Sequence, residues 1–483
     1  MKNLQELDLS YNMFEGNLPQ CINELSLLKV LEISSNQFTG IIQPSFTTNL
    51  TSLEYINFSH NKFEGLLSFS SFANHTKLEV FQFINDNDKS ELETEEPSRW
   101  IPLFQLKVLV LSSCNVNKHK RNVVPSFLLH QHKLCVLDLS HNSLKGNLPN
   151  WLVENNTMLE VLYLRNNSFD GSIRMPEFRN LHFTEMDASG NHIIGTIPGN
   201  TGRLFPSLSF LNLSMNSLSG SMPSSINSMG ELNILDLSDN KFSGEVPKNL
   251  DISLYTFDML LLDNNFFTGE ISKNKSFDVS ILDISDNLFS DSHDQFLIPL
   301  NLTSVLTLDI GNNYLSGKIH EFLEQLSELT KIESLDLSSN RLSGKIPSKL
   351  ITLTTLSVFN VSYNNLSGRL PETKGQFGTF TYASYKGNQL LCGLPLENKC
   401  TTTSPATIPS ANEDTEKGYD IDMVWFIGSL SSTWSVFLLG FVAILYTNPY
   451  CRGRWFYFIE EFMYASYYFL CELVLRPSML LNK

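Results

Sequence analysis

Cysteine and basic residues are scarce in this sequence. Seven cysteines in 483 residues are too few for a disulfide-dense scaffold. Lys and Arg total 34 against 50 Asp and Glu, which gives a formal net charge of −16. Because nucleic-acid binding draws most of its affinity from clustered Lys and Arg, this composition argues against a nucleic-acid partner.

Motifs for catalysis are missing as well. The chain contains no Gly-rich phosphate loop, no HExxH, no GxSxG and no CxxC pair. We therefore expect no enzyme, and no catalytic, cofactor-binding or metal-binding residue. The charged residues 86–99 start like a calcium loop, but Glu91 and Pro97 stand where that loop needs Gly and a bidentate Glu. We interpret this stretch as a solvated loop.

An internal repeat takes up most of the chain. The pattern LxxLxLxxNxLxG recurs about fifteen times, at a spacing of mostly about 24 or 25 residues. Alternate side chains of the LxL segment point the same way, which predicts a short strand with one face on a core. One coil cannot bury its leucines alone, but stacked coils share a continuous apolar core. The predicted fold class is an α/β solenoid with a parallel β-sheet on its concave face.

The Asn of the repeat is expected where the chain leaves each strand. Its side-chain amide can pair with backbone groups that would otherwise be buried without a partner, so stacked copies predict an asparagine ladder. The ladder positions are Asn12, Asn36, Asn61, Asp86, Cys114, Asn142, Asn167, Asn191, Asn216, Asn240, Asn265, Asn287, Asn313, Asn340 and Asn364. We interpret these residues as scaffold.

Two motifs carry a family resemblance. The repeat form LSxNxLSGxIP, closing with residues 359–368 (FNVSYNNLSG), resembles the plant extracellular leucine-rich-repeat class. Residues 387–396 (GNQLLCGLPL), followed by Cys400, an acidic stretch, an apolar segment and a short tail, resemble plant receptor-like proteins over nearly the whole chain. The resemblance implies a leucine-rich-repeat solenoid at the cell surface that recognises an extracellular ligand (peptide, microbial or wall-derived) in defence or development. Signalling would pass through a partner receptor kinase, as adaptor or co-receptor.

The chain departs from that family at three points. Met1 stands inside a repeat, without a signal peptide or the usual cap containing Cys and Trp, so we expect an N-terminally truncated product. The late repeats at Asn287, Asn313 and Asn340 leave no room for the non-repeat island that family members often carry. The solenoid is also short for the family, so part of the recognition surface is expected to be missing.

The expected segments follow from these patterns. They are a solenoid (1–371), a cap with a Cys pair (372–400), an acidic juxtamembrane linker (401–422), a transmembrane helix (423–446) and a cytoplasmic tail (447–483). Cys392 and Cys400 form the one close cysteine pair outside the repeats and the tail, and their disulfide presupposes an oxidising compartment. The tail is far shorter than a kinase domain, which needs roughly 250 residues.

Residues 423–446 carry no charge and would form a helix about 36 Å long, against a hydrocarbon core of roughly 30 Å. We predict one membrane span, because the alternative of a buried core helix would usually be shorter. Arg452 follows the span and acidic residues precede it, which predicts a single-pass type I plasma-membrane protein with an extracellular N-terminus. Gly428 and Ser432 have a spacing that lets membrane helices pair closely. The aromatic tail would lie along the inner leaflet or form an interfacial belt.

Recognition is expected where coils deviate from the common pattern. Most coils carry Asp at the exposed strand position, which we interpret as scaffold. Aromatic and Arg side chains carry much of the binding energy at interfaces, so the candidate ligand-binding residues are Tyr55, Gln82, Val110, Tyr163, Arg165 and Leu261. Ten N-x-Ser/Thr sequons suit a secreted surface, and they begin at Asn49, Asn57, Asn74, Asn155, Asn166, Asn212, Asn274, Asn301, Asn360 and Asn365.

Two other functions stay open on the sequence alone. The same repeat class resembles plant polygalacturonase inhibitors, so the second interpretation is a wall-associated inhibitor of a pathogen glycosidase. The missing signal peptide makes a truncated, non-signalling remnant the third interpretation.

Overall fold

The structure is a computed structural model, and it describes residues 3–400 except 44, 45, 47, 88, 99, 248–256, 271–278, 291–295, 297–304 and 328–330. The chain divides into two units, residues 1–402 and 403–483. The predicted membrane helix, its pairing residues Gly428 and Ser432, and the tail lie outside the described residues. Among the helices that are described, none has the length and apolar character that a membrane crossing requires.

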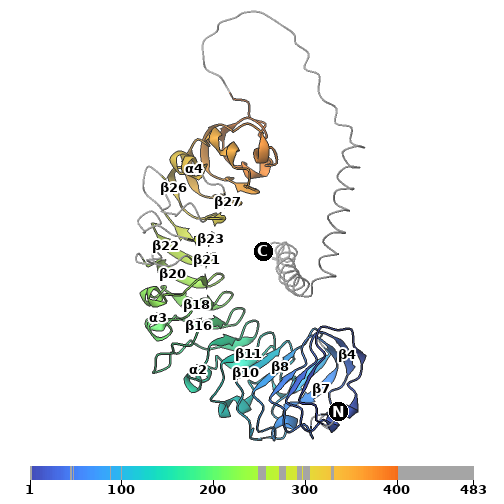
Figure 1. Ribbon diagram of the computed structural model, residues 1–483. Helices are drawn as coiled ribbons and strands as arrows, with labels where there is room; N and C mark the ends of the chain where they lie inside the picture. Colours follow the sequence, from blue (N-terminus) through green and yellow to red (C-terminus); the bar gives the residue numbers. More distant parts are fainter. Residues whose placement is uncertain are drawn as a thin grey trace, which may run out of the picture. The chain divides into compact units, whose positions relative to one another are not determined.

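One strand from each coil joins a parallel sheet, which has fifteen strands within the described residues. Neighbouring strands pair in register, so Leu31 lies between Leu7 and Ile56. Figure 1 shows strands of this sheet along one side of the stacked coils. The predicted parallel sheet is therefore confirmed. Its strands are β1 (Glu6–Asp8), β3 (Val30–Glu32), β5 (Tyr55–Asn57), β8 (Val80–Ile84), β10 (Val108–Ser112), β11 (Val136–Asp138), β13 (Val161–Tyr163), β15 (Glu185–Asp187), β17 (Phe210–Asn212), β19 (Ile234–Asp236), β21 (Phe257–Leu261), β23 (Val279–Asp283), β25 (Thr307–Asp309), β27 (Ser334–Asp336) and β29 (Val358–Asn360).

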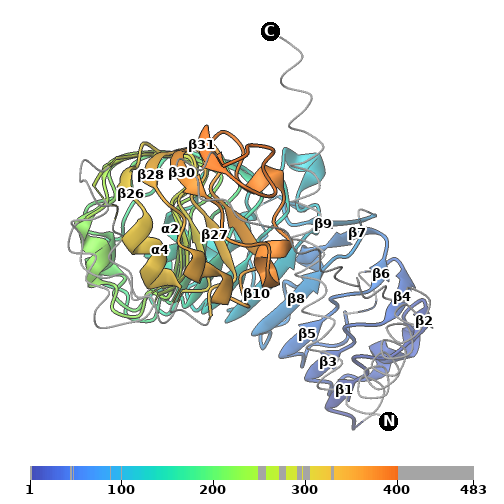
Figure 2. The same ribbon diagram turned by 90° about the horizontal axis from the view of Figure 1, so that it is seen from above.

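A second strand in many coils forms smaller parallel sheets on the flank of the solenoid (Figure 2). The repeat Gly turns the chain there, as Gly220 does with φ +79°. The flanking strands are β2 (Glu15–Gly16), β4 (Gln37–Gly40), β6 (Lys62–Phe63), β7 (Gly65–Ser68), β9 (Ser90–Glu93), β12 (Lys145–Asn147), β14 (Ser168–Asp170), β16 (Ile194–Gly195), β18 (Ser217–Gly220), β20 (Lys241–Glu245), β22 (Phe266–Gly269), β24 (Leu288–Phe289), β26 (Ser316–Lys318), β28 (Arg341–Gly344), β30 (Asn365–Arg369) and β31 (Leu390–Cys392).

Short helices complete the coils on the side away from the large sheet (Figure 1). The α-helices are α2 (Trp151–Asn155), α3 (Thr201–Leu204) and α4 (His320–Leu326). The 3-10 helices are η1 (Gln20–Glu24), η2 (Phe69–Phe72), η3 (Lys118–Lys120), η4 (Ser126–His130), η5 (Ser224–Ser228), η8 (Ser348–Thr352), η9 (Gly375–Gly378) and η10 (Tyr382–Ser384).

The core runs through the middle of the stack. Leu31, Leu109 and Leu235 are fully buried, as the repeat pattern predicts. Equivalent positions of successive coils stack, so the rings of Phe38 and Phe63 lie parallel with their centroids 6.4 Å apart. Each coil is therefore stabilised mainly by its two neighbours.

The asparagine ladder links each coil to the one before it. The Asn240 Nδ2 donates to the carbonyl oxygens of Leu213, Leu237 and Ser238 at 2.9, 3.3 and 3.0 Å. Its Oδ1 accepts from the backbone N–H of Leu218 at 2.9 Å. One side chain thus satisfies four backbone groups, two of which belong to the preceding coil.

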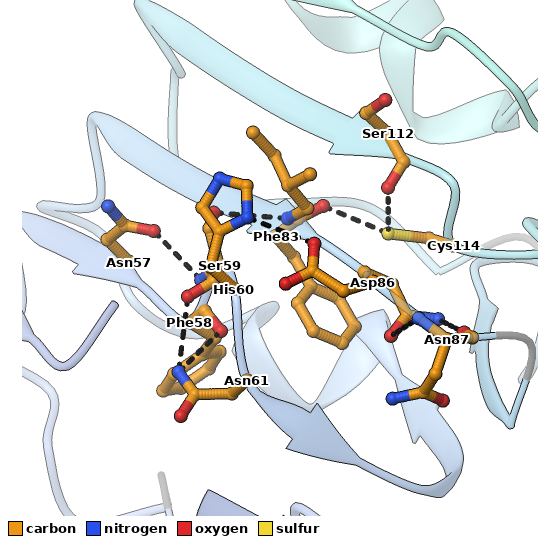
Figure 3. Close-up of polar contacts among 12 residues, drawn as sticks. Asn57, Phe58, Ser59, His60, Asn61, Phe83, Asp86, Asn87, Ser112 and Cys114 are labelled. Atoms are coloured by element: carbon orange, nitrogen blue, oxygen red, sulfur yellow. Dashed lines mark hydrogen bonds and ion pairs between the residues drawn. The ribbon is translucent and has the colours of Figure 1, made fainter. Parts of the chain in front are cut away.

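Two predicted ladder positions behave differently (Figure 3). Asp86 is exposed, and its carboxylate lies 3.0 Å from the Nδ1 of His60, so the prediction that it continues the ladder is wrong. A carboxylate cannot donate to the backbone carbonyls that Asn serves. Cys114 stays inside, where its thiol donates to the carbonyls of Phe83 at 2.9 Å and Ser112 at 3.2 Å. The single S–H proton of this thiol is shared between two of the carbonyls that an Asn amide would serve.

The charged residues 86–99 are not the solvated loop that their composition predicts. Residues 90–93 form β9, which pairs with β7 in parallel. Leu92 is buried, and Thr94 is buried with its N–H donating to the Oδ1 of Asn117 at 2.8 Å. Glu91 points outward and forms an ion pair with Lys118 at 3.0 Å. Its charge, together with that of the buried Glu93, hid the strand in the sequence.

Residues 372–400 close the C-terminal end of the solenoid. The rings of Phe377, Phe380 and Tyr385 pack against Phe359 of the last coil, with centroids between 5.3 and 5.9 Å away. These rings cover the apolar end of the stack, as terminal repeats of a solenoid require. The structure joins Cys392 and Cys400 by a disulfide.

Candidate functional site

The large sheet has a regular exposed face. In seven of the fifteen coils an Asp on this face accepts a hydrogen bond from the residue two positions later. The carboxylate of Asp236, for example, accepts from the N–H and the hydroxyl of Ser238 at 3.0 and 2.7 Å. Burial raises the pKa of Asp236 despite these bonds. This hydrogen-bonded turn fixes the chain where it leaves the strand, so we interpret these Asp residues as structural.

The deviating coils cluster on this face. Gln82 on β8 pairs in register with Val110 on β10. Val110 in turn pairs with Asp138 on β11, which pairs with Tyr163 on β13. We name Tyr55, Gln82, Val110, Tyr163 and Arg165 the central patch. Parallel strands lie about 4.8 Å apart, so the patch occupies five consecutive strands, β5 to β13. The structure places five of the six candidate ligand-binding residues on this stretch of the sheet, with Tyr55 and Tyr163 at its two ends, about 19 Å apart.

The two tyrosines of the central patch are held by carboxylates on neighbouring strands. The Tyr55 hydroxyl donates to the Oε2 of Glu32 at 2.7 Å, and the Tyr163 hydroxyl donates to Glu185. Burial, followed by the bond to Glu32, raises the pKa of Tyr55 to about 12. Burial also raises the pKa of Tyr163. Both rings are half-buried, neutral and fixed, so a partner meets them at little entropic cost.

Arg165 supplies positive charge in the central patch. It stands where most coils have Ser, and its side chain is exposed. Burial raises the pKa of Asp138 and Asp187, and the charge of Arg165 acts against that shift at both carboxyls. Burial, followed by the Arg165 charge, lowers the pKa of His141 to about 4, so this imidazole is neutral at physiological pH.

Leu261 lies apart from the central patch. It is on β21, four strands beyond β13, which is a distance of about 19 Å along the sheet. It lies instead beside an apolar row that our reading of the sequence missed. The signal was an apolar residue just before the core Leu in four successive coils. The half-buried members of this row are Phe210, Ile234, Met259 and Ile281.

Carboxylates line the face beside the apolar row. Asp263 occupies the usual Ser position, and burial, followed by the charges of Asp283, Asp239 and Asp236, raises its pKa to about 8. Burial, followed by the charge of Asp283, raises the pKa of Asp309 to about 7. Some of these carboxyls therefore hold protons near neutral pH.

The sequons differ in accessibility. Asn49, Asn74 and Asn365 are exposed, whereas Asn57 is 8% exposed and its Nδ2 donates to Glu32 at 3.0 Å. The half-buried sequons are Asn155, Asn166, Asn212 and Asn360. Asn274 and Asn301 lie outside the described residues.

The chemistry of the face is that of binding. Within the described ranges, no group of three or more His, Cys, Asp or Glu is placed to hold a metal ion. The central patch offers two fixed aromatic rings, an amide and a guanidinium. Such groups recognise a partner by contact area, hydrogen bonds and charge.

The Leucine Rich Repeat family model matches residues 3–25, 27–49, 133–154, 207–229, 231–251 and 331–353. Six segments of the chain therefore match the leucine-rich-repeat family. Receptor-like protein 15 of Arabidopsis thaliana is 40% identical to this chain over 241 residues, which is 50% of the chain and 22% of that protein. Cuscuta receptor 1 of Solanum lycopersicum is 28% identical over 347 residues, which is 66% of the chain and 28% of that protein.

These relatives confirm the resemblance to plant receptor-like proteins. The chain covers between 13% and 28% of the length of such relatives. Among solved structures, the ectodomain of the Arabidopsis receptor kinase HAESA, in complex with an N-terminally extended IDA peptide hormone, matches with a TM-score of 0.64 at 31% identity. The match covers 83% of this chain and 64% of that one. HAESA in complex with IDA and the co-receptor SERK1 matches equally well, at 32% identity.

Proposed function

We propose that this chain is the ligand-recognising part of a plant receptor-like protein, anchored in the plasma membrane with its N-terminus outside. It binds an extracellular ligand on the exposed face of the large sheet and signals through a partner receptor kinase in defence or development. The observation that carries the proposal is the central patch, where residues other than Asp occupy the exposed position on four of five neighbouring strands, with Tyr on the two outer ones.

The patch has the features of an interface hot spot. Tyr55 and Tyr163 are immobilised by Glu32 and Glu185, so binding them loses little side-chain entropy. Arg165 is exposed beside Tyr163 and can pair with an acidic group of the ligand. A ligand with an acidic group next to an apolar or aromatic one fits this arrangement best.

Signalling is delegated in this proposal. The support is the similarity to the HAESA ectodomain, which was solved with a peptide hormone and a co-receptor. The proposed span, residues 423–446, would bring the partner's membrane helix close, with Gly428 and Ser432 as the contact. Tethering two proteins in one membrane raises their effective concentration without any new contact.

The test uses the tagged full chain in plant leaves treated with microbial and cell-wall extracts. The chain is cross-linked at the cell surface and captured from membranes, and co-purified receptor kinases are quantified by mass spectrometry. We expect the double variant Tyr163→Ala and Arg165→Ala to retain at least about fivefold less kinase than the wild type. The matched control is Tyr382→Ala with Arg203→Ala, which removes an exposed Tyr and an exposed Arg from the cap and from α3.

Three outcomes would contradict the proposal. Equal loss of kinase in both double variants would show that the central patch has no special role. Recovery of the chain free in the extracellular fluid, without a kinase, would favour the glycosidase inhibitor. An unglycosylated chain in the cytosol would favour the non-signalling remnant.

A further inference from the structure

A basic surface interrupts the acidic character of this chain near its C-terminal end. The flanking strands β26, β28 and β30 carry Lys318, Arg341 and Arg369, and Lys345 follows β28 directly. These three strands contribute no Asp or Glu. Figure 2 shows them side by side, and their pairing is parallel. We name the outward side of β26, β28 and β30 the basic face.

The register places the cations on one side of this small sheet. Lys318 pairs with Ser343, and Ser343 pairs with Asn365. Residues two apart on a strand share a side, so Arg341 and Lys345 project on the same side as Ser343. Lys318, Arg341, Lys345 and Arg369 are all exposed.

Glycine keeps the basic face flat. A Cβ on Gly368 would lie 3.3 Å from the Cγ of Lys345, and a Cβ on Gly344 would lie 3.6 Å from the Cβ of Lys318. The stem of each cation therefore rests across the Gly of the next coil. Among the described residues, the side-chain cations of Lys318, Lys345 and Arg369 have no hydrogen-bond or ion-pair partner. Glu372 lies near Arg369 but pairs with Lys374 at 2.6 Å.

We propose that the basic face binds a linear carboxylated polysaccharide, a polyuronate. Three cations repeat once per coil, with Lys345 two residues beyond the partner of Lys318, and this regular stagger complements a polymer with a regularly repeated negative charge. Ser316, Ser343, Ser367 and Asn365 add polar groups suited to sugar hydroxyls.

The composition of the face separates this partner from a protein. Its outward positions on β26, β28 and β30 are Ser, Asn, Lys and Arg, without an apolar side chain. A protein partner would need an apolar or aromatic anchor at the centre of its interface. The exposed apolar side chains here, Tyr314 beneath Arg341 and Leu390 on β31, lie at the edges of the face instead. A polysaccharide can bind through charge pairing and hydrogen bonds alone. This proposal is independent of the central patch and of the proposed receptor function.

The experiment titrates the full chain, purified in a nonionic detergent, with a size-defined oligogalacturonate. We expect saturable binding that weakens with added salt. The triple variant Lys318→Gln, Lys345→Gln and Arg369→Gln should bind about tenfold more weakly. The control triple Lys62→Gln, Lys133→Gln and Lys145→Gln changes the net charge equally at exposed sites elsewhere, and it should bind as the wild type does.

Several results would overturn the proposal. An equal loss of oligogalacturonate affinity in both triple variants would mean that net charge alone governs the interaction. Undiminished binding of the fully methyl-esterified oligomer would remove the role of carboxylates. Tighter binding of poly-glutamate, or of vesicles containing anionic lipid, would assign the face to another class of partner. Thermal unfolding of both variants shows whether either substitution disturbs the fold.

Discussion

Replacing one ladder asparagine tests how the coils are held together. Asn240→Ala removes four hydrogen bonds, three donated by Nδ2 and one accepted by Oδ1. Asn240 is only 8% exposed, so water cannot readily replace those bonds. Each buried polar group left unpaired costs about 1–3 kcal/mol, and local relaxation recovers part of the sum. We expect a loss of about 3–4 kcal/mol, at the upper end for single substitutions.

The first coil offers a matched control with the same local sequence. Asn12 follows Leu-Ser-Tyr as Asn240 follows Leu-Ser-Asp, but its side chain is exposed and donates only to Leu9 and Ser10 of its own coil. Asn12→Ala should therefore cost less than about 1 kcal/mol.

Thermal unfolding and amide hydrogen exchange measure the effect on the fold. In Asn240→Ala the backbone amide of Leu218, which loses its acceptor, should exchange faster than in the wild type. Asn240→Asp keeps an acceptor for Leu218 but places a buried carboxylate against three carbonyl oxygens, so it should destabilise the fold at least as much as Asn240→Ala does. Equal destabilisation by Asn12→Ala and Asn240→Ala, or unchanged exchange at Leu218, would refute the ladder as a link between coils.

Three further predictions concern single side chains. The pKa of Asp263 is raised to about 8 in the folded protein. Between about pH 4 and pH 8 the folded state therefore keeps a proton that the unfolded state has lost. The free energy of unfolding should fall as the pH rises through this range. Asp263→Asn should flatten that dependence and stabilise the fold at about pH 8 by on the order of 1–3 kcal/mol, whereas an unchanged slope in denaturant titrations would contradict it. Labelling with a thiol reagent, followed by mass spectrometry, should modify the exposed Cys21 in the native state. Cys114 should react only on unfolding, because it is buried and burial raises its pKa well above the usual range. Glycopeptide analysis should find sugar on the exposed Asn74 and none on Asn57, whose amide is engaged with Glu32; a glycan on Asn57 would show that this coil folds differently in the cell.

Most residues of the candidate site could be predicted from the sequence, but their contacts with one another could not. Tyr55, Tyr163 and Arg165 stand out because they break a repeated pattern. Nothing local to Tyr163 shows that its hydroxyl reaches Glu185, since that contact crosses to the next strand. The apolar row ending at Ile281 was missed because each of its residues is ordinary within its own coil.

The sequence by itself determined the coil. Its period, its inward leucines and its asparagines follow from strand alternation and from the need to pair buried backbone groups, both of which act within a few residues. The misjudged stretch, residues 86–99, lacks the repeat, so its strand was recognisable only once β7 was present to pair with it.

Only the tertiary structure decided which side chains became neighbours. Gln82 lies beside Val110, and Lys345 lies across Gly368, because stacking brings residues one coil apart in the chain to adjacent positions in space. That register depends on the length of each coil and on every insertion between coils. A surface assembled from successive coils is therefore a property of the stack, while each coil taken alone displays only one or two of its residues.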